Sequence, residues 1–370
     1  MKHPSKVLVT LPWNDASVEG GAERSVYTLL NNLPGAEYKI YVVVILKKGN
    51  KENVLKHFGD HIKVNVIYAE KGWKSIWRLK NFIRDIEPHL IIGNVLHICT
   101  ITIIANLLSG KKSKVISINR GMDIRKNIEK LHLIFVYYLS NRVVAISEGL
   151  KNQMEKNLIP KLKKISVVYN PFALEDIRRK SNIPLLEKEV SWERSRKTVI
   201  YIGRFDERQK NVILLLKAFA IVSKNFELNL LLVGDGKDRK ILKEMSTQLD
   251  ITEKVHFLGL KENPFSYLSM SDILVLSSNF EGFGRVLVEA LACGVSVVST
   301  DCRSGPAEIL SNGKYGALVP VGDAKAMGAA IESTLKSPKS PSVLQKRANF
   351  FSIESSVREF QVLLKEVLTS

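Results

Sequence analysis

Short runs of β-branched and aliphatic residues alternate with helix-like stretches along almost the whole chain. Strand-like runs such as Val7–Leu11 and Tyr41–Leu46 are each followed by a helix-like stretch, and Ala22–Leu33 and Ile76–Ile86 are examples. This alternation is typical of parallel sheets covered by helices on both faces. A second series begins with the run Thr198–Ile202. We therefore predict two doubly wound, Rossmann-like α/β domains that face each other across a cleft.

The other strand-like runs have a similar composition. They are Val64–Ile67, Leu90–Ile92, Val115–Ile118, Val143–Ile146 and Ile165–Tyr169 in the first half, and Asn229–Val233, Val255–Phe257, Ile273–Leu276, Val295–Ser299 and Ala317–Val319 in the second. The chain has 370 residues, and single hydrophobic cores rarely grow beyond about 250–300 residues. Length therefore also favours two domains.

We place the domain boundary near Asn170-Pro171. Residues 1–171 then form the first domain and residues 172–350 the second. The charged stretch Glu175–Lys197 lacks apolar periodicity, so we interpret it as a linker that leads into the second domain. A final helix is predicted over Glu354–Leu368, within a segment (351–370) that we expect to pack back on the first domain.

The first domain is strongly basic. The chain has a net charge of +18, and residues 1–171 hold 27 Lys and Arg against 13 Asp and Glu. Such a domain favours a polyanionic partner, which is an anionic membrane, a nucleic acid or a pyrophosphate-linked substrate. Within it, Trp73 and Trp77 are four residues apart among Lys and Arg residues. This pattern is typical either of an interfacial membrane helix or of a helix whose aromatic face is buried in the core.

Several classes of protein are disfavoured. Three cysteines (Cys99, Cys293 and Cys302) are too few for a disulfide framework and indicate a reducing compartment. No C-x-x-C or H-E-x-x-H spacing predicts a metal site. The first predicted strand is too short for the core of a signal peptide. The apolar stretch Leu90–Leu108 contains polar residues that are costly in lipid, so we predict a buried strand followed by a helix there.

The stretch Glu281-Gly-Phe-Gly-Arg-Val-Leu-Val-Glu289 places two carboxylates eight residues apart across a predicted helix start. Helix N-termini attract phosphate, because unpaired backbone N–H groups and the helix dipole both favour negative charge there. Carboxylates on either side of a bound diphosphate can accept hydrogen bonds from sugar hydroxyls. The stretch therefore predicts a nucleotide-sugar site.

Two cations follow the predicted strand Thr198–Ile202. Arg204 comes after its end, and Lys210 stands six residues later at the start of a predicted amphipathic helix. Ligands bind at the carboxyl ends of the strands in doubly wound sheets, and an Arg fork with a Lys point charge suits a diphosphate. Arg208 is an alternative to Lys210 for this role.

Glycines and a histidine supply further candidates. Gly20 and Gly21 open the first predicted helix, where their backbone can approach a ligand closely. Gly234-Asp-Gly236 is half of a dinucleotide fingerprint, but Arg239 stands where the third glycine belongs, so a tight turn is the preferred interpretation. His97 follows the strand-like run Leu90–Ile92 and is a candidate for the acceptor or donor side.

In combination these residues resemble the retaining glycosyltransferases of family four, which have the GT-B fold and an E-x7-E motif. The resemblance runs from Gly20-Gly21 through the second domain. Its carriers are Gly203-Arg204 with Lys210, Val233-Gly-Asp-Gly236, Val255-His-Phe-Leu-Gly259, Glu281-Gly-Phe-Gly with Glu289-Ala-Leu-Ala-Cys-Gly294, and Gly305-Pro-Ala-Glu-Ile-Leu310.

The resemblance implies a role for each matching residue. Glu281 would hold hydroxyls of the donor sugar, Glu289 would hold the ribose, and Arg204 and Lys210 would neutralise the departing diphosphate. The backbone of Phe283, Gly284, Arg285 and Val286 would contact the diphosphate, and Gly259 and Leu260 would contact the base. Gly20 and Gly21 would lie near the diphosphate and the acceptor. Arg120 stands where family members often carry a histidine.

The implied activity is transfer of a hexose or N-acetylhexosamine from a nucleotide sugar to a growing polysaccharide or lipid-linked oligosaccharide, and we expect the nucleotide to be UDP. We expect no metal or other cofactor, since the chain has no Asp-x-Asp. The enzyme would work in the cytoplasm, on the inner face of the cell membrane, to which its basic first domain would bind. A GT-B nucleotide-sugar epimerase is the alternative. Nucleic-acid binding is disfavoured, because the aromatic residues lack a recognised module spacing.

Overall fold

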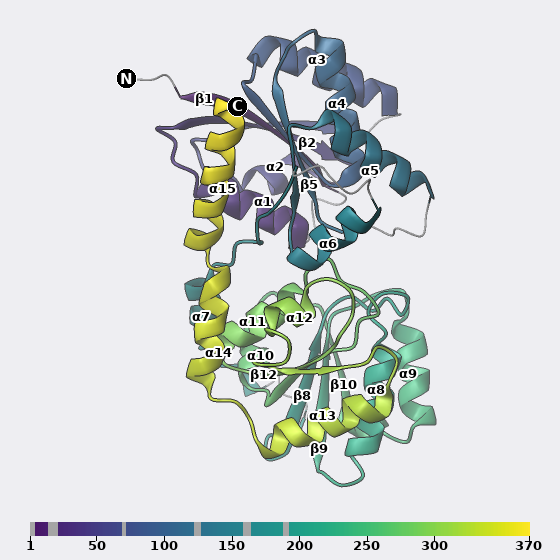
Figure 1. Ribbon diagram of the computed structural model, residues 1–370. Helices are drawn as coiled ribbons and strands as arrows, with labels where there is room; N and C mark the ends of the chain where they lie inside the picture. The colour runs from purple at the N-terminus through teal and green to yellow at the C-terminus, as the bar shows by residue number, and fades with distance from the viewer. Residues whose placement is uncertain (1–3, 14–20, 69–71, 122–126, 158–163, 188–191) are drawn as a thin grey trace. The chain divides into compact units, whose positions relative to one another are not determined.

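The computed structural model describes residues 4–13, 21–68, 72–121, 127–157, 164–187 and 192–370 (Figure 1). The chain divides into two compact units. Unit 1 comprises Met1–Phe172 together with Ile353–Ser370, and unit 2 comprises Ala173–Ser352. The last helix of the chain therefore belongs to the same unit as the first strand.

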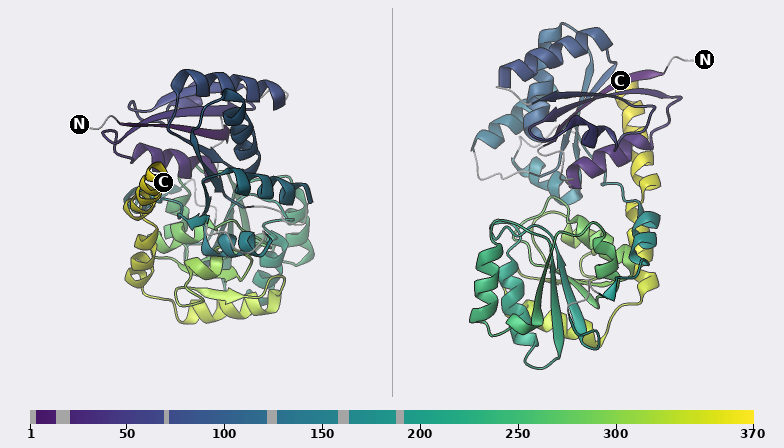
Figure 2. Two further views of the ribbon diagram at one scale, coloured as in Figure 1. Left: turned by 45° about the horizontal axis from the view of Figure 1, so that its top comes forward. Right: turned by 180° about the vertical axis from the view of Figure 1, so that it is seen from behind.

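Unit 1 is built on a seven-stranded parallel sheet with the order β3-β2-β1-β4-β5-β6-β7. Its strands are β1 (Ser5–Trp13), β2 (Tyr38–Leu46), β3 (Lys63–Tyr68), β4 (Leu90–Asn94), β5 (Lys114–Asn119), β6 (Arg142–Ala145) and β7 (Ile165–Val167). Its helices are α1 (Gly21–Asn31), α2 (Lys51–Leu55), α3 (Gly72–Ile86), α4 (Leu96–Ser109), α5 (Asn127–Leu139), α6 (Glu148–Asn157) and α15 (Ile353–Thr369). Helices α3, α4 and α5 lie side by side along one face of the sheet, and α1 packs against α15 (Figures 1 and 2).

Unit 2 is built on a six-stranded parallel sheet with the order β10-β9-β8-β11-β12-β13. Its strands are β8 (Lys197–Ile202), β9 (Leu228–Val233), β10 (Val255–Gly259), β11 (Ile273–Leu276), β12 (Ser296–Thr300) and β13 (Ala317–Val319). Its helices are α7 (Leu174–Ser181), α8 (Val212–Val222), α9 (Arg239–Gln248), α10 (Pro264–Ser269), α11 (Arg285–Cys293), α12 (Pro306–Ile309), α13 (Ala324–Lys336) and α14 (Pro341–Ala348).

The central strands of both sheets are buried on both faces. Every residue of β9 is buried, as is every residue of β4 and of β11. Helices on both sides of a parallel sheet remove both faces from water, so these strands are continuous apolar runs rather than alternating ones. The prediction of parallel-sheet α/β architecture in both halves is confirmed, and so are the strand and helix predicted within Leu90–Leu108.

One local interpretation was wrong, and one question that the sequence left open is answered. The stretch interpreted as a linker begins with α7, whose Leu174 and Ile177 are buried against α10 and α11. In α3 the tryptophans do not belong to the core, because the side chains of Trp73 and Trp77 are 66% and 56% exposed, while Ile83 is buried. No helix in the described parts of the chain is both long and apolar enough to cross a membrane.

Candidate active site

The sheet of unit 2 changes direction between β8 and β11. From β8 the chain goes outward through β9 to β10, and it then returns to the other side of β8 at β11. Ligands of open α/β sheets bind beyond the carboxyl ends of the strands at such a switch point. Arg204 follows the end of β8, and residues 277–281 follow the end of β11, so both predicted segments lie at this switch point.

Lys210 and Glu281 form a largely buried ion pair at the switch point. Lys210 Nζ lies 2.5 Å from Glu281 Oε1, and the two side chains are 18% and 8% exposed. The segments that carry them are also joined by backbone contacts, because Asn279 N donates to the Gln209 carbonyl at 2.8 Å and Ser277 Oγ donates to the Lys210 carbonyl at 2.9 Å. Two residues that are 71 positions apart in the sequence are therefore held together by the ends of neighbouring strands.

A chain of hydrogen bonds fixes the orientation of the Glu281 carboxylate. Ser278 Oγ donates to Glu281 Oε1 at 2.7 Å, and Thr300 Oγ1 donates to the Ser278 carbonyl at 2.6 Å. Ser278 and Thr300 are fully buried. Lys210 and Ser278 thus share Oε1, whereas Oε2 makes no hydrogen bond to any residue that the structure describes. Oε2 is the oxygen that can accept a hydrogen bond from a ligand hydroxyl.

Arg204 presents a guanidinium to solvent at the end of β8. Its side chain is 65% exposed and contacts Gln209 at 3.2 Å and Asp206 at 3.6 Å. The buried Tyr201 hydroxyl donates to the Arg204 carbonyl at 2.9 Å and so fixes its backbone. Arg208 is also exposed. Of the two alternatives that the sequence left open, Lys210 is the one that contacts Glu281.

Helix α11 begins without a side chain that could cap it, because its N-cap residue is Gly284, with φ of 94°. The start of α8 is different. The carboxylate of Glu207 accepts hydrogen bonds from the amides of Val212 and Ile213 at 2.7 and 3.1 Å. Burial raises the pKa of Glu207, although these two bonds oppose that shift. A protein carboxylate therefore already occupies the anion position of α8, which leaves the start of α11 as the better place for a phosphate.

Glycines allow close backbone approach around this helix start. A Cβ on Gly305 would lie 1.8 Å from the carbonyl oxygen of Phe283, and Gly305 has φ of 99°. The ring of Phe283 is buried against Phe351, so its side chain points away from solvent. The Gly234-Asp-Gly236 turn packs on β8 in the same way, because a Cβ on Gly234 would lie 1.9 Å from the Gly203 carbonyl oxygen. Its glycines thus have a structural explanation.

The other predicted donor residues lie along the same edge of unit 2. Arg285 and Glu289 are one turn apart on α11, and Arg285 Nε lies 3.9 Å from Glu289 Oε1. Gly259 ends β10, and its carbonyl accepts from the Gly234 amide at 2.8 Å. Leu260, which follows it, is 75% exposed. An apolar side chain so open to solvent at the carboxyl edge of the sheet is suited to contact a base.

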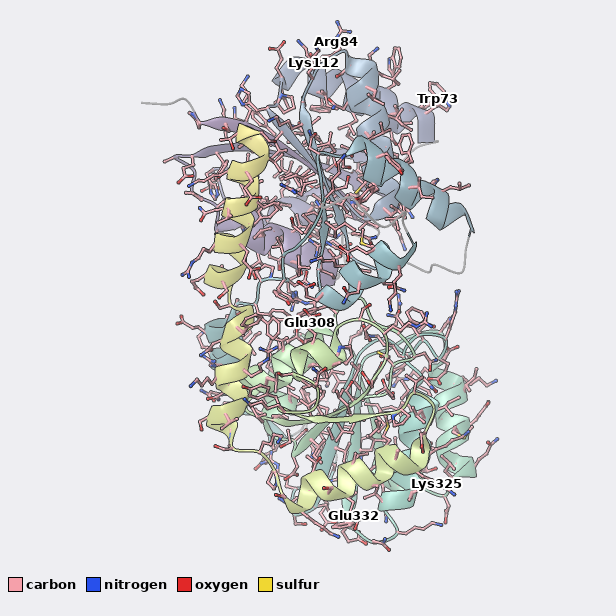
Figure 3. All side chains as sticks on the ribbon, in the orientation of Figure 1. Trp73, Arg84, Lys112, Glu308, Lys325 and Glu332 are labelled. Carbon is pink, nitrogen blue, oxygen red and sulfur yellow. The ribbon has the colours of Figure 1, made fainter. Side chains whose placement is uncertain are left out.

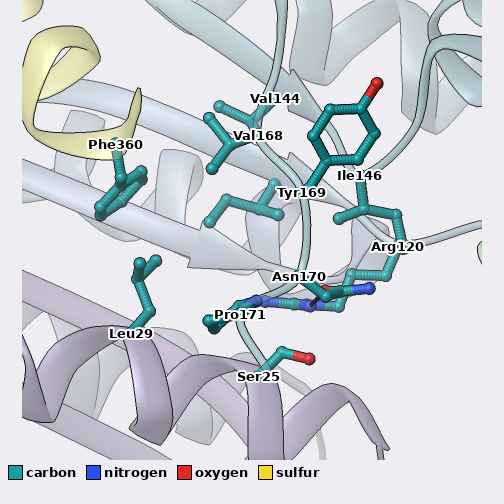
Figure 4. Close-up of a pocket in the computed structure, with 11 residues that line it drawn as sticks. Ser25, Leu29, Arg120, Val144, Ile146, Val168, Tyr169, Asn170, Pro171 and Phe360 are labelled. Carbon is teal, nitrogen blue, oxygen red and sulfur yellow. Dashed lines mark hydrogen bonds between the residues drawn. The ribbon is translucent and has the colours of Figure 1, made fainter. Parts of the chain in front are cut away.

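In unit 1 the predicted residues lie at the carboxyl edge of β4 and β5. Arg120, which follows β5, donates to Asn170 Oδ1 at 2.8 Å and to Asn94 Oδ1 at 3.4 Å. It lines a small pocket with Ser25 of α1 (Figure 4). His97 is in the first turn of α4, and burial together with nearby Lys47 and His132 lowers its pKa. Gly21 is the first residue of α1, and Gly20 lies outside the described residues.

A strained backbone precedes His97. Val95 has φ of 68°, which is a rare conformation for a β-branched residue, and it joins β4 to α4 at the switch point between β1 and β4. Strain of this kind persists where the surrounding structure fixes it, and it often occurs at functional sites.

Sequence reasoning missed the residues that position the predicted ones. Ser278, Thr300, Glu207 and Tyr201 carry no motif of their own. A usable signal for Ser278 was its place two residues after the apolar run Ile273–Leu276, because polar residues beyond the end of a buried parallel strand lie at the ligand edge of the sheet. In the described part of the chain, no three His, Cys, Asp or Glu side chains gather as metal ligands would.

Comparison with known proteins identifies the family. Residues 19–176 match the family model described as Glycosyltransferase Family 4, and residues 183–350 match the model described as Glycosyl transferases group 1. The N-acetyl-alpha-D-glucosaminyl L-malate synthase of Bacillus anthracis is 31% identical over 275 residues, which cover 72% of this chain and 71% of that enzyme. The chain therefore belongs to the glycosyltransferase family that these two models describe.

Two further relatives add detail. A Campylobacter jejuni enzyme named N-acetylgalactosamine-N,N'-diacetylbacillosaminyl-diphospho-undecaprenol 4-alpha-N-acetylgalactosaminyltransferase is 30% identical over 212 residues, which cover 57% of this chain and 55% of that enzyme. The Anabaena protein HepE, solved in complex with UDP, superposes with a TM-score of 0.79 over 98% of this chain and 100% of its own, at 19% identity. The predicted GT-B fold is thereby confirmed for this glycosyltransferase.

Proposed function

We propose that this glycosyltransferase moves a hexose or N-acetylhexosamine from a UDP-sugar to a lipid-linked oligosaccharide or a growing polysaccharide, with retention of anomeric configuration. The observation that carries the proposal is the start of α11, which has a glycine cap and is preceded by the Lys210–Glu281 pair. The UDP complex of HepE supports the donor class, and the name of the Campylobacter relative supports a diphosphate-lipid acceptor.

Each residue of the site would then act on one part of the donor. Glu281 would accept a hydrogen bond from a sugar hydroxyl through Oε2, and Glu289 would accept from the ribose hydroxyls. Gly259 and Leu260 would contact the base. The amides of residues 283–286 and the guanidinium of Arg204 would bind the diphosphate, with Lys210 adjacent.

The chemistry would proceed through an oxocarbenium-like transition state. The bond between the anomeric carbon and the phosphate oxygen breaks, and the acceptor oxygen bonds to the anomeric carbon on the same face. The acceptor proton passes to the departing phosphate. Negative charge grows on the diphosphate during this step, and preorganised positive groups stabilise it most when they do not need to move. Arg204, Lys210 and the α11 amides would supply this positive charge, so we propose that no metal is required.

The acceptor would lie against unit 1. Gly21, His97 and Arg120 would line its site, because they lie beyond the carboxyl ends of β1, β4 and β5. A diphosphate-linked acceptor would suit the Arg120 guanidinium. With a lipid-linked acceptor the enzyme would work at the inner face of the cell membrane.

A panel of nucleotide sugars tests the donor and the reaction together. Thermal-shift measurements identify the donor, because a bound ligand raises the apparent stability. NMR of the product then reports the anomeric configuration, and an inverted anomer would refute retention. Incubation with donor alone separates the alternative function, since an epimerised donor without acceptor indicates an epimerase. Glu281→Gln should abolish turnover, whereas the exposed Glu244→Gln on α9 is the matched control.

A further inference from the structure

Three neighbouring helices of unit 1 expose large apolar side chains on their outer faces. Most of the exposed large hydrophobic residues of unit 1 lie on α3, α4 and α5; they are Trp73, Trp77, Leu107, Leu108, Leu131, Ile134, Tyr138 and Leu139, which we call the α3–α5 surface. These helices pack side by side. The outer face of a surface helix in a globular protein is normally polar, so large apolar side chains exposed on three neighbouring helices require an explanation.

The outer stripe of α3 combines aromatic and cationic residues. Positions 73, 77, 80 and 84 are spaced by four, three and four residues, so they share one face of the helix. Trp73 and Trp77 occupy one end of this stripe, and Lys80 and Arg84 occupy the other. Figure 3 shows Trp73 and Arg84 projecting away from the sheet near opposite ends of α3. The opposite face of the helix, with Leu79 and Ile83, is buried in the core.

Basic residues continue around the apolar ones. Lys80 Nζ lies 3.8 Å from the ring centroid of Trp77, so cation and aromatic side chain are in direct contact. Lys111 and Lys112 follow the C-terminus of α4, a few residues after the exposed Leu107 and Leu108. Lys111 is paired with Glu87, which follows α3, and Lys112 is exposed. Apolar side chains and a rim of positive charge therefore belong to one surface.

We propose that the α3–α5 surface docks unit 1 on an anionic phospholipid leaflet, with Trp73 and Trp77 inserted at headgroup depth. Tryptophan prefers the membrane interface, because its ring is apolar and its N–H is polar. Basic residues beside it attract anionic lipid. A second copy of the chain is a poorer occupant, since two surfaces of the same charge repel each other. This inference deepens the proposed function by naming the surface that holds the enzyme at its lipid-linked acceptor.

Vesicle binding by the full chain tests the proposal. We expect co-sedimentation with phosphatidylglycerol vesicles at low salt and weaker binding to phosphatidylcholine vesicles. Binding should weaken at 1 M salt, where the Debye length falls to about 3 Å. Brominated lipids should quench the fluorescence of Trp73 and Trp77 if these residues insert. The signal is specific to them, because the chain's other two tryptophans, Trp13 and Trp192, are buried. Trp73→Ala/Trp77→Ala should abolish the quenching and weaken binding about 10-fold for each tryptophan removed.

Matched variants separate docking from general effects. Lys80→Gln and Arg84→Gln should each weaken binding about 5-fold, whereas Ile241→Ala and Lys240→Gln, at exposed positions of α9, should leave it unchanged. Wild-type protein that ignores anionic vesicles, or a tryptophan double variant that binds as wild type does, would overturn the proposal. So would a dimer by light scattering that the double variant converts to monomer. UDP-dependent thermal stabilisation of the double variant reports on the proposed function independently, since it concerns unit 2.

Discussion

Replacement of Lys210 by methionine should destabilise unit 2 far more than loss of an ordinary surface lysine. The Glu281 side chain is 8% exposed, so its carboxylate would remain desolvated after Lys210 is removed. Breaking a buried ion pair costs about 3–5 kcal/mol, because one charge is left uncompensated. The hydrogen bond from Ser278 survives and offsets part of this cost, since bonds to charged groups contribute about 1.5–3 kcal/mol. We therefore expect Lys210→Met to lower the free energy of unfolding by about 3 kcal/mol.

A double-mutant cycle with Glu281→Gln isolates the pair. Glu281→Gln should cost only about 1 kcal/mol, because the more exposed Lys210 ammonium can turn toward water. The double variant should be more stable than Lys210→Met alone, which gives an interaction energy of at least about 1 kcal/mol. Urea unfolding followed by circular dichroism measures all four proteins. Lys240→Met is the control, because Lys240 and Glu244 form an exposed pair at 3.9 Å that should contribute under about 0.5 kcal/mol.

Additive effects would refute this reasoning. If Lys210→Met changed stability by less than about 0.5 kcal/mol, and the double variant equalled the sum of the single ones, the pair would have no energetic meaning. Lys210 would then behave as an ordinary surface cation in the absence of donor, and its contact with Glu281 would not hold that carboxylate in place.

Three other outcomes follow from the structure. Arg204→Gln should leave the free energy of unfolding within about 0.5 kcal/mol of wild type, because the side chain is exposed. The same substitution should slow the formation of UDP in a transfer assay by about 10²- to 10³-fold. Unchanged turnover would contradict the proposed role of Arg204. Gly305→Ala should lower the Tm strongly, since its Cβ would collide with the Phe283 carbonyl, and an unchanged Tm would contradict this. Burial raises the pKa of Cys293 and Cys302 to about 12. A thiol whose pKa is higher in the folded than in the unfolded protein contributes its full stabilisation below the unfolded pKa, near 9, and loses this contribution as the pH rises toward 12. The free energy of unfolding, measured by urea titration, should therefore fall between pH 9 and pH 12. Rapid thiol labelling of the native protein at pH 8 would contradict the burial of these cysteines.

The parallel strands were predictable because burial on both faces leaves a continuous apolar run in the sequence. Runs such as Asn229–Val233 and Ile273–Leu276 coincide with β9 and β11 to within a residue. The alternation of these runs with helices then implies the parallel order. Ends of elements were less certain, and Ile165–Tyr169 is longer than the observed strand, Ile165–Val167.

Short or unusual helices could not be read from periodicity. Helix α7 is eight residues long and buries only Leu174, Ile177 and Ser181, which is too few positions to establish a period. Helix α8 was predicted to be amphipathic, but most of its residues are buried, because it packs against α13 and shares one hydrophobic core with the strands of unit 2. In α3 the aromatic spacing was visible, but whether that face is covered depends on neighbouring elements that periodicity does not specify.

The loops of the site were predictable, whereas their side-chain pairing was not. Arg204, Lys210 and Glu281 each follow a predicted strand, and that alone places them at one edge of the sheet. The contact between Lys210 and Glu281 depends on the adjacency of β8 and β11, which are separated by β9 and β10 in sequence. Ser278 and Thr300 support this contact from β11 and β12, and hydroxyl residues are too common for either to be singled out.

The pairing also assigns unequal roles to the two cations of the site. Lys210 is partly neutralised by Glu281 before any donor binds, and its side chain is mostly buried. Arg204 has an exposed guanidinium beside the same strand end. A departing diphosphate requires charge that little reorganisation makes available, because reorganisation during the reaction reduces electrostatic stabilisation. The contacts of Arg204 with Gln209 and Asp206 are made by an exposed side chain, whereas the shorter Lys210–Glu281 contact is largely buried. We therefore propose that Arg204 meets most of that charge, while Lys210 holds the Glu281 carboxylate in place.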